Sequence, residues 1–375
     1  MPCRILLLTA CLLATAACRH PEPPSQQNQA DGYYMRGTAA YLAGDTQGAL
    51  EAFERVRALA PDDRRLPTAE GEVLLSAGRL KDAKVRFEEA LKMDPSRGPT
   101  WARLGLIHET LREDEEAKKA LDRAIELYAD DFQALETLGR LEARRGNVDA
   151  AVDAYVRAAL AIPTGGAELM LMASDILHSA GRRDEALAVL SDAVVRNVVS
   201  GPLLRILGDL QVQSGQLREA IKSYEVAAKL SPRDPIPWEL VGEIWARLDR
   251  PAEARAAFRE SLRVRKRAVV HVAVVRLEMA QGDREAAEAA LEAAKESLDG
   301  SVEDVLAIAE GLELLGRTEE ALRVRRRLAE EPEQAGNVEL QQGVVRAAGK
   351  AGDQSLVKEA CARILAADAG VTACP

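Results

Sequence analysis

The residues that most often carry chemistry are few in this chain, and their spacing does not assemble a familiar site. The four histidines are scattered, and none has a Cys, an Asp or a second His at metal-ligand spacing on one helix face. The sequence contains no glycine-rich phosphate loop, no nucleophile elbow and no HExxH motif. We therefore predict no catalytic residue, no metal site and no cofactor, and a protein that is not an enzyme.

Cys18 is the cysteine with the clearest chemical assignment. Residues 3–18 read CRILLLTACLLATAAC, in which one arginine precedes a short apolar run that ends in small residues. This order is typical of a secretory signal peptide. The run from Ile5 to Ala17 is too short to span a bilayer comfortably, since about 20 helical residues are needed. We predict that residues 1–17 are an export signal.

The leader ends in the letters TAAC, and this ending resembles the lipobox of bacterial lipoproteins. The resemblance implies that the thiol of Cys18 receives diacylglycerol and becomes the mature N-terminus. The alternative is an ordinary signal peptide with an incidental cysteine. Residues 18–30 are rich in Pro and Gln, which predicts a disordered tether. Arg19 stands where an Asp marks inner-membrane retention in the enterobacterial scheme, so the resemblance favours the outer membrane, facing the periplasm.

The composition favours closely packed helices over sheets. Hydrophobic residues make up 47% of the chain and aromatic residues only 3%, so Ala, Leu and Val supply most of the apolar content. The formal net charge of −10 is opposite in sign to that of the usual nucleic-acid-binding protein. We therefore predict no nucleic-acid partner.

Three series of small or turn-forming residues recur along the chain, with successive members 33 to 36 residues apart. The first series is Gly44, Gly78, Arg112, Gly146, Gly181, Gly215, Asp249, Gly282, Gly316 and Gly352. The second is Gly37, Gly71, Gly105, Gly139, Ser174, Gly208 and Gly242. The third is Ala49, Ala83, Ala117, Ala151, Ala186, Ala220, Ala254, Ala287 and Ala321. Three registers in phase predict stacked helical hairpins.

This pattern resembles the tetratricopeptide repeat, and residues 203–232, LLRILGDLQVQSGQLREAIKSYEVAAKLSP, show it well. Small residues such as Gly208 and Ala220 would let the two helices of a hairpin approach closely. A residue in the left-handed conformation would end each first helix. The resemblance implies an all-α, right-handed α-solenoid of about ten repeats over residues 31–367, followed by a tail at 368–375.

In tetratricopeptide domains the first helix of each hairpin lines a concave groove. The resemblance places in that groove Glu136, Arg140, Asp175, Arg205, Asp209, Glu239 and Glu243, with Trp245 as a candidate surface anchor. Acids outnumber arginines in this set, so we predict that the groove binds a segment with exposed Lys or Arg. The family's Lys and Asn clamp for a peptide carboxylate is absent from the first repeats, which argues against binding of a chaperone tail.

Two basic runs and two C-terminal cysteines leave alternatives open. The runs at 263–267 and 323–327 fall near the ends of second helices, where positive charge complements free carbonyl groups, or they contact an anionic lipid or glycan. Cys361 aligns with core positions such as Phe87, which indicates a buried thiol. An oxidising compartment would equally allow a disulfide between Cys361 and Cys374.

The lipid, the tether and the groove together supply a location and a binding surface but no chemistry. We therefore expect an envelope-anchored scaffold or assembly factor whose partners are other envelope proteins or their peptide segments. Narrower alternatives that the resemblance implies are a pilotin-like factor for a type IV pilus secretin and an exopolysaccharide-export component. The alternative from another class is an accessory to a peptidoglycan-associated enzyme.

Overall fold

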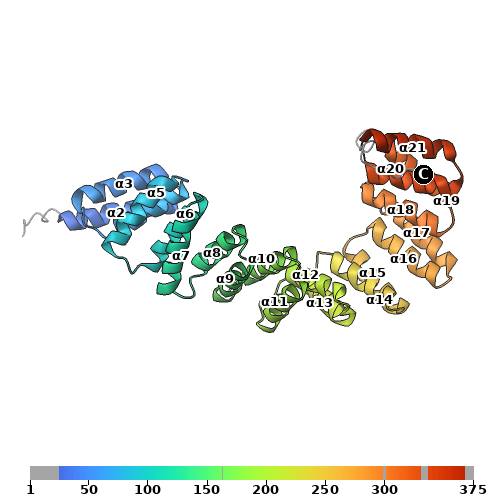
Figure 1. Cartoon of the computed structure of the whole chain (residues 1–375), viewed down its shortest axis with the longest axis horizontal. Coiled ribbons are helices and arrows are strands. Elements are labelled where there is room, and N and C mark those ends of the chain that lie inside the picture. Colours follow the sequence, from blue (N-terminus) through green and yellow to red (C-terminus); the bar gives the residue numbers. More distant parts are fainter. Residues whose placement is uncertain (1–24, 163, 299–300, 331–336, 368–375) are drawn as a thin grey trace, which may run out of the picture. The chain divides into compact units, whose positions relative to one another are not determined.

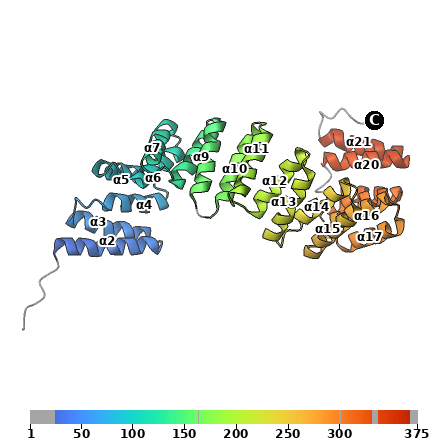
Figure 2. The same ribbon diagram turned by 90° about the horizontal axis from the view of Figure 1, so that it is seen from below.

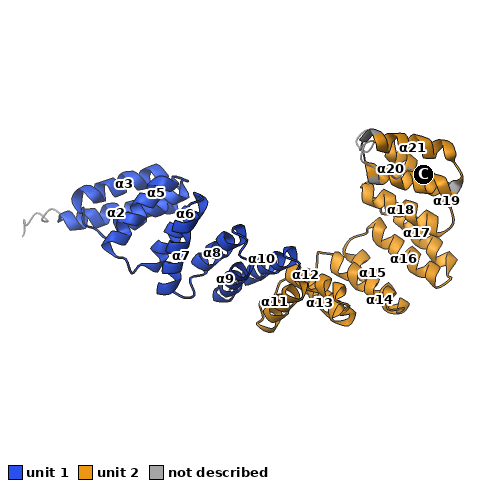
Figure 3. Cartoon of the chain, viewed as in Figure 1, with its two compact units in different colours: residues 1–181 blue, residues 182–375 orange. Residues whose placement is uncertain are grey.

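The computed structural model describes residues 25–162, 164–298, 301–330 and 337–367, and these contain twenty α-helices and no strand (Figure 1). The predicted all-α solenoid of helical hairpins is confirmed. The chain divides into two compact units at Gly181, and each is described by itself below (Figure 3). Within the described ranges, none of the helices combines the length and the apolar character that a membrane span requires.

The first unit consists of four hairpins and one further helix, stacked in chain order (Figure 2). Each first helix packs on its own second helix, and each second helix also contacts the first helix of the next hairpin. The helices are α2 (Gln26–Leu42), α3 (Thr46–Leu59), α4 (Leu66–Ser76), α5 (Leu80–Met93), α6 (Gly98–Thr110), α7 (Asp114–Leu127), α8 (Phe132–Arg144), α9 (Val148–Ala161) and α10 (Gly166–Ser179).

The second unit begins with the second helix of a hairpin and continues with five complete hairpins that pack in the same way. The helices are α11 (Arg183–Val195), α12 (Gly201–Gln213), α13 (Leu217–Leu230), α14 (Ile236–Arg247), α15 (Pro251–Val264), α16 (Ala268–Ala280), α17 (Arg284–Glu296), α18 (Val302–Leu314), α19 (Thr318–Ala329), α20 (Val338–Ala351) and α21 (Gln354–Ala367).

The predicted turn residues end the first helices as expected. All ten have a positive φ, and they include the non-glycine residues Arg112 at 63° and Asp249 at 55°. A residue in this left-handed conformation reverses the chain after the first helix and lets backbone N–H groups bond the last carbonyls of that helix. The amide of Arg250, for example, donates to the carbonyl of Trp245 at 2.9 Å.

The two small-residue registers lie inside the hairpins. Every alanine of the third series is fully buried. The glycines of the second series face large side chains of the second helix: a Cβ on Gly242 would lie 2.6 Å from ring atoms of Phe258. One hairpin later two side chains of intermediate size, the fully buried Val275 and Leu291, share a cluster in place of Gly and Phe. Close packing is thus retained although the glycine register stops.

Helix α2 begins at Gln26, inside the segment 18–30 that we predicted to be a disordered tether. Residues 26–30, which we expected to be disordered, form its first turns. The hydroxyl of Ser25 accepts a hydrogen bond from the amide of Asn28 at 3.2 Å, and Ala30 is fully buried in the first apolar cluster. A side-chain cap and one buried alanine therefore extend the helix into a polar stretch. The leader, Cys18 with the rest of the tether, and the tail lie outside the described residues.

Candidate functional site

The predicted groove residues of the first unit lie on α8 and α10. Glu136 is partly buried, whereas Arg140 and Asp175 are exposed. Arg140 Nη2 lies 3.2 Å from Glu109 Oε2 of α6, and Arg103 of α6 similarly bonds Glu72 of α4 at 2.8 Å. Arg140 therefore joins the first helices of neighbouring hairpins, in addition to being open to solvent.

Two predicted groove residues of the second unit stabilise their own hairpin. The hydroxyl of Tyr224 on α13 donates to Asp209 Oδ1 of α12 at 2.6 Å, and Arg205 lies one turn before Asp209, with Nη1 at 3.5 Å from Oδ2. Burial, reinforced by this hydrogen bond, raises the pKa of Tyr224 well above its ordinary value. The carboxylate of Asp209 is therefore engaged by groups of its own chain.

Glu239 is also engaged. Its Oε2 lies 2.6 Å from Nη1 of Arg267, and the two side chains are only 12% and 20% exposed. Arg267 additionally reaches Glu303 of α18 at 3.3 Å. Burial raises the pKa of the Glu239 carboxyl, and the charge of Arg267 opposes that effect. This pair connects α14 to the start of α16, so it serves the stacking of the hairpins.

Glu243 differs from the other predicted acids of the second unit. It is exposed on α14, one turn after Glu239, at the edge of a cleft of about 390 Å³. Phe258, Ala273 and Leu277 give the cleft an apolar lining. Nearby protein atoms displace enough water to raise the pKa of the Glu243 carboxyl despite this exposure, and the charges of Arg276 and Arg247 oppose that effect. Among the residues that the structure describes, no side chain forms a hydrogen bond or ion pair with Glu243.

Trp245 is partly buried on the same helix. Its ring packs against two apolar clusters, one of which contains Tyr224 and the other Phe258. The guanidinium of Arg250 lies 5.6 Å from the ring centroid, a cation–π contact. The structure therefore gives Trp245 a packing role within the second unit and leaves only part of its ring open.

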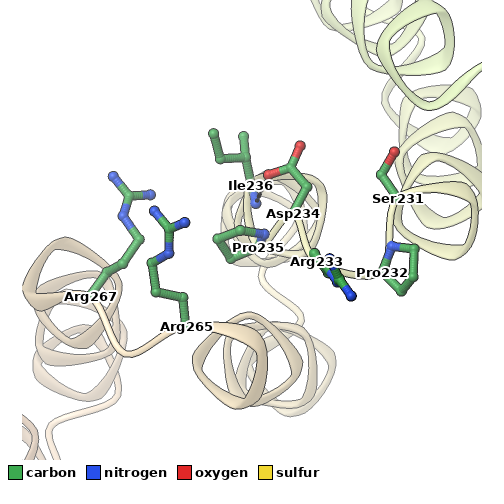
Figure 4. Close-up of a pocket in the computed structure, with 8 residues that line it drawn as sticks. All are labelled: Ser231, Pro232, Arg233, Asp234, Pro235, Ile236, Arg265 and Arg267. Atoms are coloured by element: carbon green, nitrogen blue, oxygen red, sulfur yellow. Dashed lines mark hydrogen bonds between the residues drawn. The ribbon is translucent and has the colours of Figure 1, made fainter.

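A second hollow was missed by the sequence analysis. It measures about 650 Å³ and lies between two loops, where residues 231–236 face Arg265 and Arg267 (Figure 4). We predicted that the run 263–267 falls near a helix end, and Arg263 does lie in the last turn of α15; the helix stops at Val264, so Arg265 and Arg267 belong to the connection before α16. The repeat period carried the signal: Arg233 and Arg267 are 34 residues apart and hence occupy equivalent loops.

The cysteine predictions fall partly outside the described residues. Cys361 is buried on α21 within the last apolar cluster, as its alignment with core positions predicts. Cys374 and Cys18 lie outside the described residues, so the disulfide and the lipidation stay predictions. Over the described ranges, no group of three or more His, Cys, Asp or Glu side chains is placed to hold a metal ion.

Three family models described as tetratricopeptide repeat match separate parts of the chain, at residues 30–63, 74–141 and 207–268. These segments lie within the stacked helical hairpins of both units. The chain is a tetratricopeptide repeat protein. Tetratricopeptide repeats are typically non-catalytic and bind other proteins or peptides, so the fold indicates a protein-interaction scaffold.

Other proteins with similar sequences are much longer than the matched part. The chain is 25% identical over 125 residues to BBSome complex member BBS4 of Xenopus tropicalis, covering 33% of this chain and 24% of that protein. It is 25% identical over 183 residues to Superkiller protein 3 of Schizosaccharomyces pombe, covering 49% and 11%. The chain thus spans about a quarter or less of these relatives.

Several solved structures are similar to parts or most of the chain. A crystal structure of MamA protein is 24% identical, with 44% of this chain and 90% of that chain covered and a TM-score of 0.41. A crystal structure of yeast Tom70 is 12% identical, with 93% of each chain covered and a TM-score of 0.45.

Proposed function

We propose that this protein is an envelope-anchored scaffold or assembly factor that holds a basic segment of a partner protein. The leader and the lipobox-like ending at Cys18 support a lipid anchor, and Arg19 after the cysteine supports the outer membrane, with the repeats in the periplasm. The observation that carries the binding function is Glu243, an exposed carboxylate without a side-chain partner among the described residues, at the edge of an apolar-lined cleft.

The charges around this cleft favour a cation. Arg276 lines the cleft but is paired with Glu310 of α18. Arg247 and Asp249 also line it and offset each other. The four charged residues of the lining sum to zero, and the pairing of Arg276 with Glu310, outside the lining, leaves the charge of Glu243 in excess. A lysine of the partner could lay its methylene stem on Phe258 and Leu277 and place its ammonium group beside the carboxylate of Glu243.

A pull-down from detergent-solubilised envelopes tests the binding site. We expect wild-type protein to capture a defined set of envelope proteins by mass spectrometry, and Glu243→Lys to lose them. The matched control is Glu219→Lys, an exposed acid on second helix α13, which should keep them. Equal capture by wild type and Glu243→Lys would place the partner elsewhere. Glu239 is unsuitable for this test, because its reversal would break the pair with Arg267.

The identity of the captured proteins separates the narrower alternatives. Secretin or pilus components would support a pilotin-like factor, and polysaccharide-export components would support a role in export. Enzymes acting on peptidoglycan would support an accessory role.

The anchor is tested independently of the partner. We expect wild-type protein to incorporate labelled fatty acid and to fractionate with outer membranes, because the thiol of Cys18 would carry diacylglycerol. Cys18→Ala should incorporate none. A labelled Cys18→Ala protein, or an unlabelled wild type, would contradict lipidation at this residue.

A further inference from the structure

We propose that the hollow between the α13–α14 and α15–α16 connections binds carboxylate side chains of an acidic peptide segment. We name this site the arginine pocket; it is lined by residues 231–236 with Arg265 and Arg267 (Figure 4). It lies at the loop edge of the second unit, at the opposite end of α14 from Glu243. The inference is independent of the function proposed for the Glu243 cleft.

Two of the three arginines of the pocket are available to a ligand. Arg267 is held by Glu239 and Glu303. Arg233 and Arg265 are exposed, and neither forms a hydrogen bond or ion pair with any residue that the structure describes. The chain has 60 acidic and 50 basic residues, so acids that could pair with arginines are plentiful. Two arginines left open beside one hollow therefore favour a ligand of negative charge.

The balance of charge selects a carboxylate. Asp234 is the one acid in the lining, and its Oδ1 accepts a hydrogen bond from the amide of Ile236 at 3.0 Å. Arg267 is already neutralised by Glu239 and Glu303, so Asp234 counts against Arg233 and Arg265, and these three side chains leave an excess of one positive charge. A carboxylate carries one negative charge and accepts two parallel N–H bonds from a guanidinium, whereas a phosphate dianion would stay partly uncompensated.

The start of α16 adjoins the pocket, because Arg267, the residue before its first turn, is part of the lining. This helix begins at Ala268, directly after Arg267, and no side chain caps it. The N–H groups of its first turn therefore keep their positive partial charge. Helix α14 contributes less, because Pro235 and Pro237 carry no N–H at its first turn.

The apolar part of the lining indicates a peptide rather than a free ion. Pro232, Pro235 and Ile236 line the pocket, and Ile236 is 41% exposed although its side chain is large and hydrophobic. Pro235 is already buried, so covering the exposed Pro232 and Ile236 would add favourable apolar burial to the ion pairs. A segment in which acidic and apolar residues alternate would satisfy both the arginines and this lining.

Fluorescence anisotropy with purified full-length protein tests the pocket. The probe is a dye-labelled peptide of alternating Glu and Val, acetylated and amidated so that only side-chain carboxylates are charged. The matched probe has Gln in place of Glu. The variant Arg233→Gln/Arg265→Gln removes both available arginines, and Arg218→Gln, an exposed arginine on α13 outside the pocket, is its control.

We expect the Glu peptide to bind wild type and Arg218→Gln alike, and to bind the double variant at least about tenfold more weakly, which corresponds to about 1.4 kcal/mol. The Gln peptide should bind wild type at least about tenfold more weakly than the Glu peptide does. Equal affinity of wild type for the two peptides would overturn the proposal, as would equal affinity of the double variant and Arg218→Gln for the Glu peptide. So would a protein that binds inorganic phosphate through these arginines but ignores the Glu peptide. An unchanged circular dichroism spectrum establishes that the double variant is folded, and Glu243→Lys should not alter this affinity.

Discussion

The ring of Tyr224 on α13 lies against the backbone of Gly208 on α12, so closely that a Cβ on Gly208 would be 2.4 Å from Cε1 of the ring. The next residue, Asp209, accepts a hydrogen bond from the hydroxyl of the same tyrosine. One pair of consecutive residues thus provides the space for the ring and the acceptor for its hydroxyl. Gly37 and Gly71 accommodate Phe53 and Phe87 in the same way.

We expect Gly208→Ala to destabilise the protein by about 1–3 kcal/mol, because the added methyl group must displace the ring of Tyr224. Thermal and denaturant unfolding of both proteins measures the effect. The control is Gly32→Ala on α2, where a Cβ would meet nothing within 4 Å. That change should leave stability unchanged or raise it, since alanine favours helix. Equal destabilisation at both positions would contradict the close contact at Gly208.

Ala220→Asp is a more severe change in the same hairpin. Ala220 is fully buried on α13, so the new carboxylate would lie between helices without a partner. We expect a loss of about 3–5 kcal/mol, seen as a lower unfolding midpoint. Lys222→Asp introduces the same side chain at an exposed position of α13 and should change stability by about 0.5 kcal/mol or less. A melting temperature of Ala220→Asp equal to that of the parent would invalidate the repeat register.

Two arginines of one connection should differ in their effect on folding. Arg267→Gln leaves the mostly buried Glu239 without its ion pair, and we expect a loss of about 1–3 kcal/mol. Adding Glu239→Gln should recover part of that loss, because no buried charge then remains unpaired. Arg265→Gln, which removes an exposed side chain, should stay within about 0.5 kcal/mol of the parent. A double variant no more stable than Arg267→Gln would speak against the pair.

Glu243 should reduce stability at neutral pH. Its carboxyl has a raised pKa in the folded protein, so the folded state binds this proton more tightly than the unfolded chain does. The proton bound to Glu243 stabilises the folded state. This contribution is complete below the ordinary pKa of 4.5 and is lost as the pH rises through the pKa of the folded state. Glu243→Gln should therefore unfold at a higher temperature than the parent at pH 7, and the difference should shrink toward pH 4. Glu219→Gln, at an exposed site, should show neither effect. A difference independent of pH would argue against the raised pKa.

The sequence predicted the repeat architecture because its determinants are local and periodic. The turn residues, including the non-glycines Arg112 and Asp249, could be found from their spacing alone, as could the buried alanines. The first turns of α2 could not, because residues 26–30 resemble a polar linker until Ser25 caps them and Ala30 meets the first cluster. The composition of a segment is an average and does not reveal the effect of single residues. Here one capping side chain, Ser25, and one buried side chain, Ala30, were enough to extend the helix.

The sequence by itself determined the hairpins, their register and which helix of each hairpin comes first, since helix caps, apolar stripes and small residues act within one repeat. Only the tertiary structure decided which polar side chains stay available. Asp209, Glu239 and Glu243 look equivalent in the sequence, yet the first two are engaged by Tyr224 and Arg267, and the third has no side-chain partner among the described residues. Pairing depends on how neighbouring repeats stack, and a long side chain can reach groups that no spacing rule places beside it.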